Sequence, residues 1–117
     1  MTTTPISLQQ MLSAAGLSTG QQRELFALVA LGVLESLENK LLTPAEALRV
    51  FFTFDNCRFV QMRLQSEPAD AIMSQGVQLA DLFDALPDSD ASRELATEIS
   101  VMRQHCLHLL ETERLVA

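Results

Sequence analysis

A chain of 117 residues, 48% of them hydrophobic, can bury one sizeable core, so we expect a single domain over residues 1–117 and no intrinsic disorder. The net charge of −7 argues against direct nucleic-acid binding, which requires clustered Lys and Arg. The longest uncharged apolar run, Leu25 to Leu34, is too short for a membrane span, and Met1 to Pro5 lack the basic region of a signal peptide, so we expect a cytoplasmic protein without a membrane partner.

The first predicted helix is short. Thr4 before Pro5 is typical of an N-cap followed by the first helical residue, and Gly16 can end the helix. The residues that form its apolar face are Ile6, Leu8, Met11, Leu12 and Ala15.

The second predicted helix covers residues 20–38 and is apolar on nearly all sides. This pattern indicates a central helix covered by its neighbours. Gly32, in its middle, lowers helix stability, so we expect another helix to approach closely there. Two pairs at its start have capping-box spacing, Ser18 with Gln21 and Thr19 with Gln22.

The clearest helix start is Thr43-Pro44-Ala45-Glu46, which combines an N-cap Thr, a Pro at the first position and a Glu three residues after the cap. The next segment, residues 53–64, suits either a helix capped by Asp55 or a strand pair that turns at Asp55-Asn56. We favour the helix.

Two more helices are predicted before the C-terminus. One begins at Pro68, breaks or bends near Gly76 and ends at Pro87. Its apolar residues are Leu79, Leu82, Phe83 and Leu86. The last helix begins at Asp88 or Asp90. It carries an apolar seam with alternating spacings of four and three residues, formed by Leu95, Ile99, Met102, Cys106 and Leu109.

Together these elements predict an all-α fold, a single-domain bundle of five or six mostly antiparallel helices. The alternative is an α+β fold with a small hairpin around Asp55-Asn56. Cys57 and Cys106 lack the dense pairing of small secreted domains, so we expect reduced, buried thiols.

Motifs of catalysis are missing from the sequence, which has no Gly-rich phosphate loop, nucleophile elbow or paired CxxC spacing. His105 and His108 lie three residues apart on the last helix, but structural zinc normally needs four ligands. We expect no enzyme, no metal and no cofactor. An enzyme that uses the His105/His108 region is the less favoured alternative.

The whole net charge lies between Glu67 and Glu98, where Arg93 is the only base. Acidic side chains near the start of a helix are stabilised by the positive end of the helix dipole. A solvated helix face therefore explains part of this charge pattern. A surface for a basic protein partner is the alternative, and both stay open. The candidate partner-binding residues are Asp81, Asp84, Asp88, Asp90, Glu94 and Glu98.

Four phenylalanines, Phe51, Phe52, Phe54 and Phe59, lie close together in the sequence. Packing in the core is the favoured interpretation, because large aromatic side chains supply much of the burial of a small core. A pocket or groove for a partner peptide is the alternative.

At Leu31-Gly32-Val33-Leu34 and Glu46-Ala47 followed by Phe51-Phe52, the chain resembles a family of short bacterial proteins of unknown function. The shared pattern is a Leu-Gly-x-Leu helix, a short polar turn and an acidic-Ala helix that ends in Leu-Phe. The resemblance covers residues 25–54 and implies no catalytic residue. In size, acidity and helical content the chain is also similar to immunity proteins, the cytosolic inhibitors that bacteria encode beside their toxins.

The leading hypothesis is therefore a small acidic binding protein, most concretely an immunity protein that occludes a cognate bacterial toxin domain. A toxin that handles nucleic acid needs a basic cleft, which an acidic helix surface can enter. The second hypothesis is an adaptor or secretion chaperone that holds a partner peptide with its Phe-rich helices.

Overall fold

The computed structural model describes residues 4–13 and 16–116. In chain order its elements are α1 (Leu8–Ser13), α2 (Thr19–Glu38), α3 (Pro44–Val50), α4 (Phe54–Phe59), the π-helical segment η2 (Val60–Leu64), α5 (Glu67–Gln78), α6 (Asp81–Ala85) and α7 (Asp88–Val116). These described residues contain no strand. The all-α fold is confirmed, and the hairpin at Asp55-Asn56 is wrong because both residues lie in α4.

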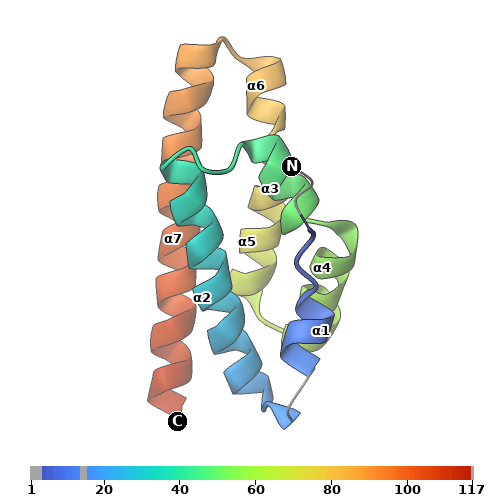
Figure 1. The fold of residues 1–117 in the computed structure, drawn as a ribbon. Coiled ribbons are helices and arrows are strands. Elements are labelled where there is room, and N and C mark those ends of the chain that lie inside the picture. Colours follow the sequence, from blue (N-terminus) through green and yellow to red (C-terminus); the bar gives the residue numbers. More distant parts are fainter. Residues whose placement is uncertain (1–3, 14–15, 117) are drawn as a thin grey trace.

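The two longest helices, α2 and α7, lie side by side and run in opposite directions (Figure 1). Arg23 near the start of α2 pairs with Glu113 near the end of α7, and Glu38 at the end of α2 pairs with Arg103 in the middle of α7. Helix α5 packs against α7, whereas α1 and η2 pack against α2. None of the helices in this part of the chain is both long and apolar enough to cross a membrane.

Two predicted capping boxes begin helices as expected. Ser18 accepts a hydrogen bond from the backbone N–H of Gln21 and starts α2, and Thr43 does the same for Glu46 at α3. The Glu46 carboxylate in turn accepts from the backbone N–H of Thr43, and this bond, together with a smaller effect of the Thr43 side chain, lowers the pKa of that carboxyl. Sequence patterns of this kind are reliable because the contacts are local.

The N-terminal segment differs from its prediction. Helix α1 begins at Leu8, and Ser7, not Thr4, accepts from the backbone N–H of Gln10. Before the helix, the backbone N–H of Ile6 donates to the carbonyl of Val50, at 2.8 Å. This contact with a distant segment holds the chain outside a helix, so the N-cap at Thr4 is wrong. Ala15, expected on the apolar face, lies outside the described residues.

The segment of residues 53–64 is helical, as favoured, but it divides into α4 and η2. Thr53 is the N-cap, because its hydroxyl accepts from the backbone N–H of Asn56, so a cap at Asp55 is wrong. The π-helical turns of η2 end at Gln65, whose φ of 48° is left-handed.

Gly32 of α2 and Gly76 of α5 have roles that differ from those predicted. Gly32 is exposed, and a Cβ at this position would have nothing within 4 Å, so the expected close approach at Gly32 is wrong. Gly76 is buried in α5, where a Cβ would overlap the ring of Phe52. Helix α5 continues through Gly76 to Gln78 and turns at Leu79, so the expected break lies slightly later.

The core is built around α2 and the aromatic side chains of the middle segment. Phe26 stacks on Phe51 with ring centroids 6.1 Å apart, and Phe51 meets Phe52 edge to face at 5.1 Å. Phe59 is also buried, whereas Phe54 is 76% exposed. Three of the four clustered phenylalanines therefore belong to the core, as favoured. Helix α2 is not covered on all sides, because its Leu28 is 54% exposed.

The predicted seam of α7 is confirmed. Ile99, Met102, Cys106 and Leu109 are buried, and Leu95 packs against the core. Burial raises the pKa of the Cys106 thiol to about 12 and also raises the pKa of the half-buried Cys57 thiol. Both cysteines are free, as expected. Raised pKa values leave little thiolate at neutral pH, so neither is a reactive nucleophile.

Candidate functional site

All six candidate acids lie on one helical hairpin, which we call the acidic hairpin and which comprises α6 and the first turns of α7 (residues 81–98). Leu86 is extended and precedes Pro87, which prevents the helix from continuing and reverses the chain. Helix α6 packs mainly against α7. In Figure 1 this hairpin forms one end of the molecule and extends beyond the connection between α2 and α3.

The acids of the hairpin are accessible. Asp81, Asp84, Asp88 and Glu94 are exposed, whereas Asp90 and Glu98 are partly buried. The only base of the hairpin, Arg93, is already paired with Asp90. Within the described part of the chain no other acid of this group has an ion-pair partner. The hairpin therefore carries a negative charge that is not neutralised internally.

Two acids of the same sequence segment lie elsewhere. Glu67 and Asp70 are in the first turn of α5, whereas α6 and the acidic hairpin follow the last turn of that helix. Twelve residues of α-helix separate the two ends by about 18 Å. Burial, with a smaller effect of the Glu67 charge, raises the pKa of Asp70. The acidity of the sequence segment is thus divided between two places on the molecule.

Beside the acidic hairpin lies an apolar pocket of about 350 Å³, between the end of α2, the α2–α3 connection, α6 and α7. Its main apolar lining consists of Leu37, Leu42, Pro44, Phe83, Leu95 and Ile99. Phe83 and Leu86, two of the apolar residues predicted at helical spacing, are 36% and 38% exposed, and α6 contains no buried residue. The short α6 covers α7 only on one side. The pocket itself was not predicted.

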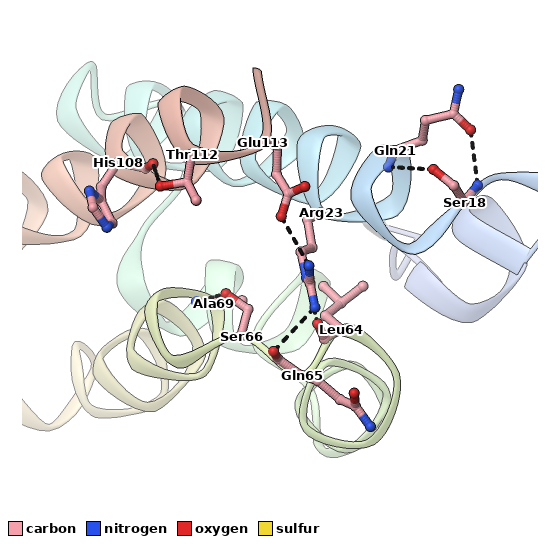
Figure 2. A network of polar contacts seen from close by, with 10 residues as sticks. All are labelled: Ser18, Gln21, Arg23, Leu64, Gln65, Ser66, Ala69, His108, Thr112 and Glu113. Carbon is pink, nitrogen blue, oxygen red and sulfur yellow. Dashed lines mark hydrogen bonds and ion pairs between the residues drawn. The ribbon is translucent and has the colours of Figure 1, made fainter. Parts of the chain in front are cut away.

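A polar network at the opposite end of the α2–α7 pair involves Arg23 (Figure 2). Its Nε donates to the carbonyl of Leu64 at 2.7 Å, and its other nitrogens reach the carbonyl of Gln65 and the carboxylate of Glu113 at 3.3 and 3.1 Å. Arg23 thus satisfies carbonyls that the end of η2 leaves unpaired. A Cβ at Gly20 would lie 2.9 Å from Glu113 Oε2, so glycine makes room for the carboxylate.

Replacing Arg23 by methionine is expected to lower the free energy of unfolding by about 2 to 3 kcal/mol, because Glu113, only 8% exposed, loses its cation. Urea unfolding followed by circular dichroism measures the loss. The matched control is Arg63→Met, since Arg63 is exposed and should change stability by less than about 0.5 kcal/mol. Equal effects of the two changes would contradict a structural role for the network.

The two histidines of α7 do not form a metal centre with other residues that the structure describes. His105 is half-buried and His108 is exposed, and the backbone carbonyl of His108 accepts from the Thr112 hydroxyl at 2.8 Å. Across residues 4–13 and 16–116, no three His, Cys, Asp or Glu side chains are placed to hold a metal ion together.

The sequence model of the family described as "Protein of unknown function (DUF3969)" matches residues 19–115, which include every residue of the acidic hairpin and of the apolar pocket. No curated protein and no solved structure matches the chain.

Proposed function

The chain belongs to the DUF3969 family of unknown function, and from its geometry we propose that it is a protein-binding module whose acidic hairpin receives a basic surface of another protein. The observation that supports this proposal is the projecting hairpin, whose acids, apart from the pair of Asp90 with Arg93, have no ion-pair partner among the described residues. A field of one sign on an accessible surface speeds the approach of an oppositely charged partner.

The most concrete partner of this kind is a toxin domain with a basic cleft for nucleic acid, which would make the chain an immunity protein. A helical surface with spaced carboxylates offers such a cleft the charges that it normally finds on phosphates. The hairpin is suited to this role because it forms one end of the molecule and extends beyond the α2–α3 connection.

The adaptor or chaperone alternative gains less support. It required the clustered phenylalanines to hold a partner peptide, but Phe51, Phe52 and Phe59 are buried in the core. Only Phe54 remains exposed. An enzyme based on His105 and His108 also has little support, because His108 lines a separate pocket of about 210 Å³ that His105 does not line.

The proposal predicts that reversing Asp81 and Asp84 to Lys slows association with the native partner by about tenfold or more. Because both side chains are exposed on α6, the circular dichroism spectrum should be unchanged. The partner is first recovered from the source organism by affinity purification. Association and dissociation rates are then measured by surface plasmon resonance at increasing salt concentrations.

The matched control reverses two acids at the other end of the molecule, Glu24 on α2 and Glu111 on α7, for which the structure gives no ion pair. Both double variants change the net charge equally, so only position distinguishes them. Glu35 and Glu38 are unsuitable controls because both pair with Arg103. If the two double variants slow association equally, or if salt has no effect on the wild-type rate, the acidic hairpin is only a solvated face.

A further inference from the structure

We infer that the apolar pocket beside the acidic hairpin binds one aliphatic or aromatic side chain of the partner, and that this anchor is flanked by Lys or Arg in the partner's sequence. The inference rests on the proposed function and adds the chemical form of the segment that is recognised. It joins two features of one hairpin, since α6 and α7 supply both the charges and part of the pocket wall.

The pocket has the size and lining of an anchor site. Its volume of about 350 Å³ lies in the range of small-ligand pockets and exceeds a single leucine or phenylalanine side chain. Leu37 and Leu42 form one wall, and Leu95 and Ile99 of α7 form another. The strongest contacts in protein interfaces are commonly side chains that fill well-packed, desolvated pockets within a polar rim.

The apolar surface continues around the opening of the pocket. Phe83 lines the pocket and remains 36% exposed, and Leu41, beside the lining residue Leu42, is 76% exposed. Helix α6 covers little apolar surface of its own, because none of its residues is buried. This part of the molecule therefore offers contact area that the fold itself does not use.

Charge determines which kind of apolar ligand the pocket accepts. Asp88 precedes the lining residue Ser92 by four residues on α7, so both lie on the same face of the helix. The lining itself contains one acid, Glu38, which pairs with Arg103, and one base, Lys40, which has no ion pair among the described residues. On the Asp88 side of the pocket, a carboxylate is repelled, whereas a segment with Lys or Arg gains attraction.

A second copy of the chain is a poor occupant. A symmetric dimer formed through this face would place two acidic hairpins against each other, since a two-fold interface uses the same surface on both copies. Arg93, the only base of the hairpin, is already paired with Asp90 and offers no free cation to the other copy. Like charges at such an interface oppose association.

The test selects peptides without any assumption about their sequence. A phage library of random 12-residue peptides is panned against the wild-type protein, and the most enriched peptides are synthesised. Their affinities and rates are measured for wild type, for Ala96→Leu, which fills the pocket from its α7 wall, and for Asp81→Lys with Asp84→Lys. The matched control for the filling is Thr97→Leu, next on α7 but outside the lining.

We expect enriched peptides that share an aliphatic or aromatic residue beside Lys or Arg. Ala96→Leu should weaken their binding by about tenfold or more, since an anchor of this size loses its burial. The weaker affinity should come from a faster dissociation rate, and the association rate should still depend on the salt concentration. Ala96 is exposed, so the variant should keep its circular dichroism spectrum, and Thr97→Leu should bind as wild type does. Phe83→Ser, which removes one wall, should weaken binding as well.

The outcomes distinguish a failure of the pocket as an anchor site from a failure of the acidic hairpin as a binding surface. Basic peptides that bind wild type and Ala96→Leu equally would refute the pocket as an anchor site but leave the proposed acidic surface intact. Peptides that are sensitive to Ala96→Leu but indifferent to salt and to the Asp81 and Asp84 reversal would refute the proposed function. Acidic peptides, no enrichment, or a wild-type dimer in sedimentation analysis that Ala96→Leu dissociates would overturn the inference.

Discussion

Replacing Gly76 by alanine is expected to destabilise the protein by about 2 kcal/mol or more, although alanine is a far better helix former than glycine. A Cβ at this position would overlap three ring atoms of Phe52. The ring cannot turn away easily, because it is 2% exposed and packs edge to face against Phe51. Urea unfolding of the variant, compared with wild type, measures the effect.

The matched control is Gly32→Ala in α2. Gly32 is also within a helix, but a Cβ there would meet nothing within 4 Å. The same chemical change should therefore stabilise the protein by up to about 1 kcal/mol through helix propensity. Opposite signs at the two glycines are the expected result, and a stabilising effect of Gly76→Ala would show that α5 can move away from Phe52.

A double variant tests whether the Phe52 ring causes the loss. Phe52→Leu alone should destabilise the core, but it also removes ring atoms that the new methyl group would meet. The two changes together should therefore cost less than the sum of their separate effects, because the residues are in contact. Simple additivity would place the cause of the Gly76→Ala effect elsewhere.

Sequence patterns predicted the fold well where contacts are local. The capping boxes of Ser18 and Thr43 connect residues three positions apart, and both are formed as expected. The predicted seam of α7 was also correct. Residues spaced alternately four and three apart lie on one face of a helix, so packing of neighbouring helices against that face is enough to bury them. Local rules are sufficient for such features.

The errors occurred where a distant segment decides the local structure. Gly32 and Gly76 look alike as single residues, but Gly76 follows Ala69, Ile72 and Met73 at helical spacing and so belongs to a buried face. That spacing was a signal in the sequence which the prediction did not use. The ring of Phe52 above Gly76 could not be predicted, since it depends on how α3 packs against α5.

The candidate site was only partly predictable. Charge alone identified the six acids, and the proline at position 87 identified the turn that brings α6 back onto α7. The apolar pocket is formed by segments from three parts of the chain, with Leu37, Phe83 and Ile99 as representatives, so no local pattern marks it. Periodicity identified Phe83 only as an apolar residue at helical spacing, because it cannot show that α6 is too short to be covered on both sides.

The second large effect is expected at Asn56, the polar side chain that holds the N-terminal segment. Its Nδ2 donates to the carbonyls of Ile6 and Phe51, both at 2.8 Å, and its Oδ1 accepts from the backbone N–H of Leu8 at 3.0 Å. The side chain is 2% exposed, so water cannot replace these bonds. Asn56→Ala should lower the free energy of unfolding by about 2 to 3 kcal/mol, since three backbone groups lose their partner.

Asn56→Asp should be more harmful at neutral pH, by about 3 to 5 kcal/mol, because a carboxylate would face two carbonyl oxygens in a buried place. Burial would raise the pKa of the new carboxyl above its value in the unfolded chain. The folded state would then bind the proton more tightly, so the penalty is complete above the raised pKa and shrinks as the pH falls toward about 4.

The pH dependence separates the two variants in urea titrations at pH 4 and pH 7. The difference in stability between wild type and Asn56→Asp should be smaller at pH 4, whereas the difference for Asn56→Ala should hardly change, since alanine does not titrate. Gln104→Glu is the control for an added acid, because Gln104 is exposed on α7 and the change should have little effect at either pH. If Asn56→Asp is equally destabilised at both pH values, its carboxyl reaches solvent, and the N-terminal segment is not held by Asn56 in the way that the hydrogen bonds indicate.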